Sequence, residues 1–398
     1  MRIIGKILNL TAICLMLLNG CGGGGGVASN TVSYTGGAQV GEVVSFSVNN
    51  DSNGIPATYS YTITKSAFGC DVTTATCHTG SGTLTANGDG TYTMSQFATS
   101  KLRILANGLI FGSVQVPVNG ISTTVPFVAM QKPAVNISDI ADAGGTIMNW
   151  VEFQCTTPAG VNGGSCHTYI GTVKIMPDAT WVSCAGYNLA DTGNSVNSGN
   201  SNNCSTAHSN LRTGKVTNNN DGTWSLQSTD DGTTYYNVGT FIAFSDPTSG
   251  QRVAIFDLND PVHTFWGYGQ IVAASQVSVA ISSSGYGTWI ANEYWPTKAF
   301  KNSYIQATVT QNAANPTTVA DMSVKVTDST GSQTVTGTLA VNSVNYGGRG
   351  AGAWPGFLSP TTDSSEVDLL AGSGFFTAVA GLNGQNSVMI ETGFKNSN

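Results

Sequence analysis

The sequence predicts an all-β protein made of antiparallel, sandwich-like or barrel-like domains whose loops are stapled by disulfide bonds. Three observations predict this class. Short segments rich in Val, Ile, Thr and aromatic residues recur from Thr31 to the end of the chain, and many alternate apolar and polar side chains as half-buried strands do. Turn-forming clusters separate them about every ten residues, the spacing of sandwiches and barrels. Apolar residues at helical spacing are scarce.

The strand pattern is clearest in seven segments, which are, in chain order, VVSFSV, TYSYTI, GTYTM, IFGSVQVPV, GTVKIM, YIQATVT and MSVKV. Three turns repeat a Gly-Thr pair before an aromatic residue: Ala86–Thr91 before YTM, Asn219–Thr223 before WSL and Ser283–Thr288 before WIA. Glycine supplies the positive φ that tight hairpins need. A calcium loop is the alternative for the first two, but neither has the ligand spacing or the closing Glu. We therefore expect hairpin turns.

Two larger units are expected. Residues 31–130 have the length of a β-sandwich-like domain, and Met130–Ala134 is the expected linker. Residues 138–398 form a larger antiparallel unit, in which the segment from about residue 312 either completes the unit or forms a small third one. The start of this unit, ADAGGTIMNWVEFQC, resembles the opening of lipocalin-type barrels, because a Gly-Thr pair precedes a strand that carries aromatic residues. This resemblance favours an antiparallel meander.

The composition is low in charge without being that of a disordered chain. Charged residues make up 9% of the sequence, against about 25% in an average globular protein. Apolar residues make up 40%, and much of the remainder is Gly, Ser, Thr and Asn, which indicates a folded β-rich protein with a surface of hydroxyls and amides. Without the positive charges of Arg2 and Lys6, the formal charge of −7 becomes −9. Nucleic acid is therefore excluded as a partner.

The first 20 residues have the pattern of a secretory signal peptide. Arg2 and Lys6 precede an apolar run from Ile7 to Leu18, which is shorter than the roughly 20 residues that span a bilayer. The following Leu18–Cys21 stretch resembles the lipobox of bacterial lipoproteins, although Asn19 departs from the usual small residue. An ordinary secretory signal cleaved nearby is the alternative.

The lipoprotein resemblance implies a membrane anchor. Residues 1–20 would be removed by signal peptidase II, and Cys21 would carry diacylglycerol and palmitate. Residues 21–30 would then be the lipidated cysteine and a flexible glycine-rich tether. Gly22 stands where an Asp would retain the protein in the inner membrane, so the resemblance implies outer-membrane sorting. Whether the body faces the periplasm or the cell surface stays open.

The cysteines agree with export. Cys14 would leave with the signal peptide, and besides Cys21 six cysteines remain. Their order along the chain favours the neighbouring pairs Cys70–Cys77, Cys155–Cys166 and Cys184–Cys204. An oxidising compartment favours disulfides over a metal site, and no CxxC pair is present.

Motifs that carry chemistry are few. GxSxG, HExxH, SxxK and P-loop patterns are absent from the sequence. The histidines His78, His167, His208 and His263 could bind zinc or copper if the loops of the first three converged, but exposed loop residues are the favoured interpretation. Asp257, Asp260 and His263 could do acid–base work, although turn chemistry explains them better. We assign no catalytic residue, metal or cofactor.

Aromatic residues supply the candidate ligand-binding side chains, which are Trp266, Tyr268, Trp289, Tyr294 and Trp295. Aromatic faces stack on sugar rings, but buried aromatic residues of a barrel give the same pattern, and core packing is favoured.

These observations lead us to expect a lipid-anchored cell-envelope protein, a non-enzymatic scaffold or binding module at the outer membrane. A surface adhesin or a receptor that captures a carbohydrate or other ligand is the alternative, and a glycan-directed hydrolase is the weaker one. The expected partners are the membrane, through the lipid anchor, and a glycan or another envelope protein.

Overall fold

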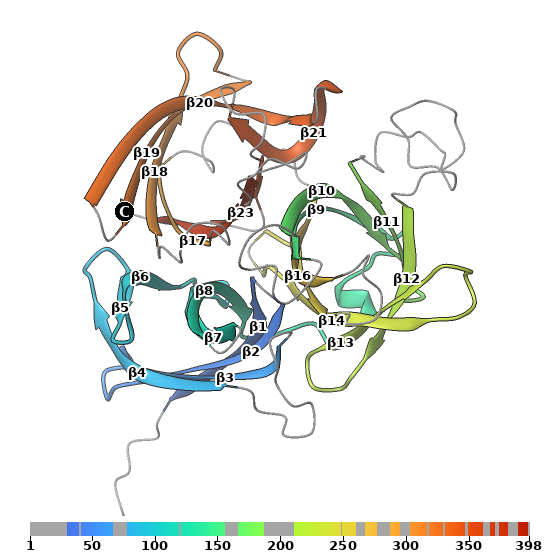
Figure 1. The fold of residues 1–398 in the computed structure, drawn as a ribbon, viewed down its shortest axis with the longest axis horizontal. Helices are drawn as coiled ribbons and strands as arrows, with labels where there is room; N and C mark the ends of the chain where they lie inside the picture. Colours follow the sequence, from blue (N-terminus) through green and yellow to red (C-terminus); the bar gives the residue numbers. More distant parts are fainter. Residues whose placement is uncertain are drawn as a thin grey trace, which may run out of the picture.

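The computed structural model describes residues 30–39, 41–66, 78–118, 121–155, 166–186, 211–247, 249–259, 267–276, 287–294, 303–316, 318–328, 331–346, 349–360, 367–370, 374–380 and 389–396. The expected signal peptide, Cys21, the tether up to residue 29 and the Cys70–Cys77 pair lie outside these residues. Within them, no helix has the length and apolar character needed to span a membrane. The described chain is all-β and folds into three closed antiparallel barrels of eight strands each, which follow one another along the sequence (Figure 1).

The first barrel occupies the segment expected to be sandwich-like. Its strands are β1 (Thr31–Ala38), β2 (Glu42–Asn50), β3 (Pro56–Ser66), β4 (His78–Ala86), β5 (Thr91–Met94), β6 (Phe97–Ile104), β7 (Leu109–Val118) and β8 (Ile121–Met130). β1 pairs with both β2 and β8, so the sheet has no open edge and forms one barrel instead of two packed sheets. Its interior is filled by aromatic rings, with Phe46 stacked 5.8 Å from Tyr59 and 4.8 Å from Phe127.

The second barrel begins after the linker. Its strands are β9 (Thr146–Cys155), β10 (Cys166–Ile175), β11 (Thr180–Ala185), β12 (Leu211–Asn218), β13 (Trp224–Thr229), β14 (Tyr236–Ser245), β15 (Arg252–Asn259) and β16 (Tyr268–Ser275). β9 closes the barrel by pairing with β16 as well as β10. The preceding segment, residues 133–145, carries the short 3-10 helix η2 (Ile137–Asp139); we call this segment the strap.

The third barrel is formed by the rest of the chain. Its strands are β17 (Gly287–Tyr294), β18 (Ser303–Gln311), β19 (Val319–Asp328), β20 (Gly331–Tyr346), β21 (Arg349–Pro360), β22 (Val367–Leu370), β23 (Phe375–Ala380) and β24 (Met389–Asn396). The stretch expected to be one unit, 138–398, therefore contains two barrels. The boundary lies between Ser275 and Gly287 instead of near residue 312, because β17 pairs with the last strand, β24.

The three barrels lie side by side around a shared apolar core (Figure 1). The ring of Phe111 in β7 stacks 4.7 Å from the ring of Phe375 in β23, which joins the first and third barrels. The side-chain amide of Asn292 joins the same two barrels, since it accepts from the backbone N–H of Lys101 at 3.2 Å and donates to its carbonyl at 3.0 Å.

The expected hairpin turns are confirmed in the first two barrels, where each joins the fourth strand to the fifth. Asp89 accepts hydrogen bonds from the backbone N–H and the hydroxyl of Thr91, and Asn87 donates to the same hydroxyl. Asn219, Asp221 and Thr223 repeat these contacts. The carboxylates are therefore used to shape the turns. The third turn, up to residue 286, lies outside the described residues.

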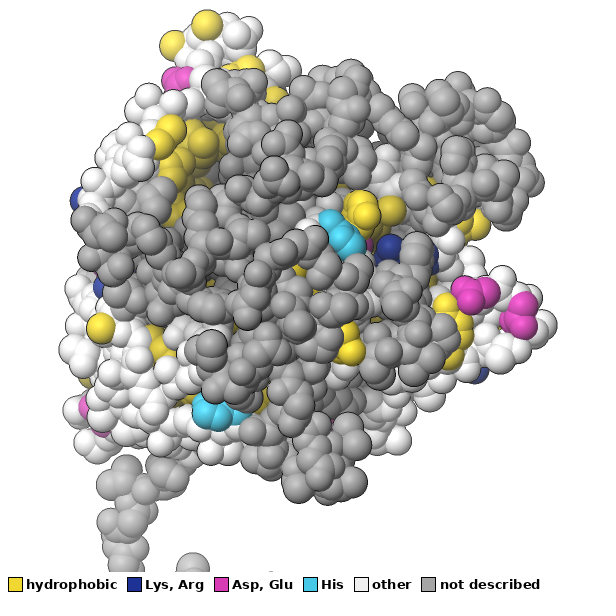
Figure 2. Space-filling view, in the orientation of Figure 1, with side chains coloured by type: hydrophobic (Ala, Val, Ile, Leu, Met, Phe, Trp, Pro, Cys, Tyr) yellow, Lys and Arg dark blue, Asp and Glu magenta, His cyan; other side chains and the backbone are white. Residues whose placement is uncertain are grey.

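The outer face of the first barrel carries the hydroxyl-rich surface that the composition indicates. Ser33, Ser47, Ser60 and Ser81 lie opposite one another on four successive strands, and all four are exposed or half-exposed. Thr31, Asn49, Thr58 and Thr83 form a parallel row. Figure 2 shows that described charged side chains are few and scattered on the face that it draws.

The expected Cys155–Cys166 disulfide is confirmed, and it joins directly opposite positions of β9 and β10. Cys184 is also disulfide-bonded, to a cysteine outside the described residues, so its pairing with Cys204 stays a prediction.

Candidate functional site

The interior of the second barrel contains a buried pair of opposite charges. On β9, Val151 and Phe153 point outward and belong to the apolar core shared by the barrels. Trp150 belongs to the apolar cluster inside the second barrel. Because successive side chains of a strand alternate between its two faces, Glu152 points inward with Trp150.

Glu152 meets Arg212 inside the barrel. Arg212 Nη1 donates to Glu152 Oε1 at 3.5 Å, and the exposed fractions of the two side chains are 8% and 0%. Glu152 Oε2 is buried and accepts no hydrogen bond within the described part of the chain. A buried ion pair with one long contact recovers little of the free energy that desolvating two charges costs. The barrel therefore carries these charges at the expense of stability.

Two further titratable groups share this region, His167 and Tyr169 on β10, whose rings lie 5.0 Å apart. Burial lowers the pKa of His167 below 6.5, with the positive charge of Arg212 adding to this effect and Glu152 opposing it. Burial and the negative charge of Glu152 raise the pKa of Tyr169. Both rings are therefore neutral at neutral pH, so they offer hydrogen-bonding groups without adding charge.

Two tryptophans form rigid walls deeper in the barrel. The indole of Trp150 lies across Gly171 of β10, and that of Trp181 lies across Gly214 of β12, so that a Cβ at either glycine would come within 2.5 Å of the ring. Trp150 Nε1 also donates to Ser183 Oγ at 3.0 Å. The glycines leave the space in which these large rings lie flat against the neighbouring strand.

A cavity of about 20 Å³ lies between these walls and Arg212. It is lined by Trp150, Val173, Trp181, Ser183, Arg212, Leu226, Phe256 and Ile271. A space of roughly 10–15 Å³ is enough for one water molecule. The cavity therefore has room for a water-sized group beside the guanidinium of Arg212, against a mostly apolar lining.

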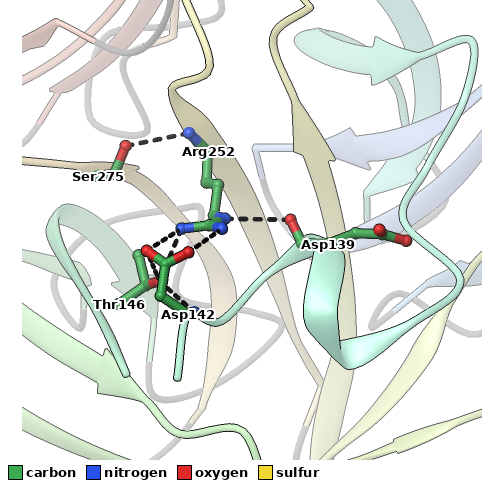
Figure 3. A network of polar contacts seen from close by, with 5 residues as sticks. All are labelled: Asp139, Asp142, Thr146, Arg252 and Ser275. Carbon is green, nitrogen blue, oxygen red and sulfur yellow. Dashed lines mark hydrogen bonds and ion pairs between the residues drawn. The ribbon is translucent and has the colours of Figure 1, made fainter. Parts of the chain in front are cut away.

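The strap closes the end of the barrel that lies away from Glu152. Ile140 is fully buried within the interior cluster, and Trp224 Nε1 donates to the carbonyl of Ala134 at 2.9 Å. Figure 3 shows Arg252 of β15 clamping this segment from outside: its guanidinium donates to both carboxylate oxygens of Asp142, at 2.6 and 2.7 Å, and to the carbonyl of Asp139. The strap therefore occupies the end of the barrel opposite Glu152.

The aromatic residues that were candidates for ligand binding do not form one platform in the described part of the chain. Trp289 is buried in the third barrel, where its ring packs edge-on against Phe376 at 5.4 Å. It is therefore a core residue and presents no face to a surface ligand. Tyr268 is half-buried at the start of β16. Tyr294 ends β17, but its side chain, Trp266 and Trp295 lie outside what the structure describes.

The fold does not bring together the two described histidines that the sequence offered as part of a metal site. His78 lies in the first barrel beside Tyr61, whereas His167 lies in the second, and His208 and His263 lie outside the described residues. No group of three or more His, Cys, Asp or Glu suited to a metal occurs in the part of the chain that the structure describes. Asp257 is buried and points away from the interior, on the face that packs against the first barrel.

Sequence reasoning missed Glu152 and Arg212. The signal for Glu152 was its position two residues after Trp150 in NWVEFQC, which gives the two side chains one face of a strand. Arg212 had no comparable signal, because only the pairing of β11 with β12 brings it inside.

Comparisons with known proteins give no family. No family model matches the sequence, and no curated protein matches it. Among solved structures, a protein of unknown function from the DUF3598 family of Nostoc punctiforme is 11% identical, with 63% of this chain and 95% of that one covered and a TM-score of 0.23. Kievitone hydratase from Nectria haematococca is 10% identical, with 67% and 94% covered and a TM-score of 0.20. These values are too low to indicate a shared function.

Proposed function

We propose that this chain is a non-enzymatic, lipid-anchored binding protein of the bacterial outer membrane that holds a small ligand inside its second barrel. The observation that carries the ligand site is the buried Glu152–Arg212 pair beside a cavity. Apolar side chains of similar volume would fill a structural barrel at lower cost. In the first barrel, stacked rings such as those of Phe46, Tyr59 and Phe127 fill much of the interior.

The shape of the second barrel supports the same function. Ligand sites are usually recesses with an apolar lining and a few convergent polar groups. Here the strap closes one end, Trp150 and Trp181 line the depth, and the Glu152–Arg212 pair supplies the polar groups. The membrane anchor is supported by the resemblance of Leu18–Cys21 to a lipobox.

The anchor is tested by metabolic labelling of the full chain with radioactive palmitate in a Gram-negative host. We expect label on the wild-type protein and none on Cys21→Ala. Equal labelling of both, or none on either, would overturn the anchor without affecting the ligand site.

The ligand site is tested by purifying the protein from envelopes and identifying the small molecules that it retains by mass spectrometry. The comparison is a double variant, Glu152→Leu with Arg212→Met, which replaces the pair by apolar side chains. Asp321→Asn with Lys325→Gln removes one charge of each sign from the outside of the third barrel and is the matched control. We expect a retained molecule in the wild type and the control that the interior variant lacks. Identical sets in all three proteins would contradict the proposal.

A further inference from the structure

We propose that the second barrel selects neutral, planar molecules that carry a hydroxyl group, and that this hydroxyl donates a hydrogen bond to Glu152. This inference rests on the proposed function, because it names the ligand class of the same site. It follows from the charge balance of the interior, from the open oxygen of one carboxylate and from the shape of the walls.

The charges inside the barrel already balance. Glu152 is negative and Arg212 positive, and they lie 3.5 Å apart, while His167 and Tyr169 are neutral at neutral pH. A charged ligand would bring a further charge into this buried space, with no opposite charge left for it among the described interior side chains. Burying an uncompensated charge is costly. The balance therefore favours a ligand without net charge.

One acceptor of the buried ion pair is still open. Glu152 Oε1 receives the hydrogen bond from Arg212, whereas Oε2 receives none within the described residues, although the side chain is fully buried. A buried carboxylate oxygen is stabilised by a donor, and hydrogen bonds to charged acceptors are stronger than those between neutral groups. A hydroxyl supplies the donor without adding charge.

The walls favour a flat molecule. Trp150 and Trp181 are held against Gly171 and Gly214, and Trp150 is also fixed by its hydrogen bond to Ser183. Fixed aromatic faces are suited to stacking with planar rings. The cavity itself is about 20 Å³, so a ring enters only when aliphatic lining side chains change rotamer. We accordingly expect dissociation constants on the order of 1 mM for single-ring probes.

The test uses four single-ring probes that differ in charge and donor: phenol, benzoate, benzylammonium and toluene. Binding to the full-length protein in mild detergent is measured at neutral pH by ligand-observed NMR. We expect phenol to bind about tenfold more tightly than toluene, benzoate or benzylammonium. Glu152→Gln should weaken phenol about tenfold and leave toluene unchanged. Asp321→Asn, the same chemical change on the outside of the third barrel, should alter neither.

Each contrary result has its own meaning. If benzoate bound most tightly, Arg212 would be the recognition group. If benzylammonium bound most tightly, Glu152 would act as its counter-ion. If toluene bound as tightly as phenol, the hydroxyl of the ligand would play no part in recognition. Any of these overturns the ligand class. The proposed function survives them if the binding is lost in the Glu152→Leu, Arg212→Met double variant. If no probe binds and no envelope molecule is retained, the ligand class and the proposed function fall together.

Discussion

The carboxylate of Glu152 and the guanidinium of Arg212 face each other across the interior of the second barrel, 3.5 Å apart and almost completely shielded from solvent. They come from strands that are not neighbours, β9 and β12, so the pair exists only once the barrel has closed. The same barrel that buries these charges keeps a cavity that Arg212 lines. The buried ion pair and the cavity beside Arg212 together make this barrel the candidate site.

Removing one member of the pair should destabilise the protein more than removing both. Arg212→Met leaves a buried carboxylate without its counter-charge, which costs about 3–5 kcal/mol, whereas an apolar replacement of both partners is close to neutral. Urea unfolding of Arg212→Met and of the Glu152→Leu, Arg212→Met double variant checks this order. A double variant less stable than the single one would show that the pair stabilises the fold.

Stability should depend on pH through His167. Burial lowers the pKa of this imidazole in the folded state below 6.5, so the unfolded chain binds the proton more readily. The contribution of His167 to the free energy of unfolding is therefore most favourable above pH 6.5. The protein loses stability as the pH falls from there toward the lowered pKa. The melting temperature of the wild type should fall over this range relative to that of His167→Gln. Parallel curves for the two proteins would contradict the lowered pKa.

The strap should be held mainly by its apolar contacts. Ile140 is fully buried, and Ile140→Ala should cost about 2–5 kcal/mol. Arg252 binds an aspartate, Asp142, whose side chain is 67% exposed, so Arg252→Gln should cost less than about 1 kcal/mol. Urea unfolding of the two variants measures the difference. A larger loss for Arg252→Gln would mean that the clamp in Figure 3 holds the strap.

The contact between the first and third barrels should depend on Asn292. Its amide makes two hydrogen bonds with the backbone of Lys101, and Asn292→Ala leaves both backbone groups without that partner, which costs about 1–3 kcal/mol. Limited proteolysis should then cut the chain between the barrels faster than in the wild type. Thr308→Ala, on the exposed face of β18, serves as the control. Unchanged cleavage of Asn292→Ala would contradict the role of this contact.

The sequence indicates the class of the fold because its signals are local. Alternating strands, Asp-Gly turns and the spacing of Cys155 and Cys166 are all short-range patterns, and the structure confirms the all-β class, the first two turns and that disulfide. Closure into barrels depends on pairings between distant strands, such as β17 with β24. Composition and periodicity do not encode which strands meet, so the third barrel was missed as a separate complete unit.

The candidate site was harder to predict than the fold for the same reason. Glu152 and Arg212 are far apart in sequence and resemble ordinary strand residues until the barrel brings them together. Trp289, a candidate for ligand binding, follows the core-packing interpretation that the sequence favoured. An aromatic residue in a strand has the same local pattern in a core as on a binding surface, and its contact with Phe376 identifies it as core.

Hydrogen exchange with and without the molecule retained from envelopes tests the central claim most directly, because it locates binding within the chain. A ligand inside the second barrel should slow the exchange of backbone amides in β9 to β12, which surround Glu152 and Arg212, and leave those of the first and third barrels unchanged. Slower exchange confined to the first or third barrel, or no change in any strand, would contradict a ligand site beside the Glu152–Arg212 pair.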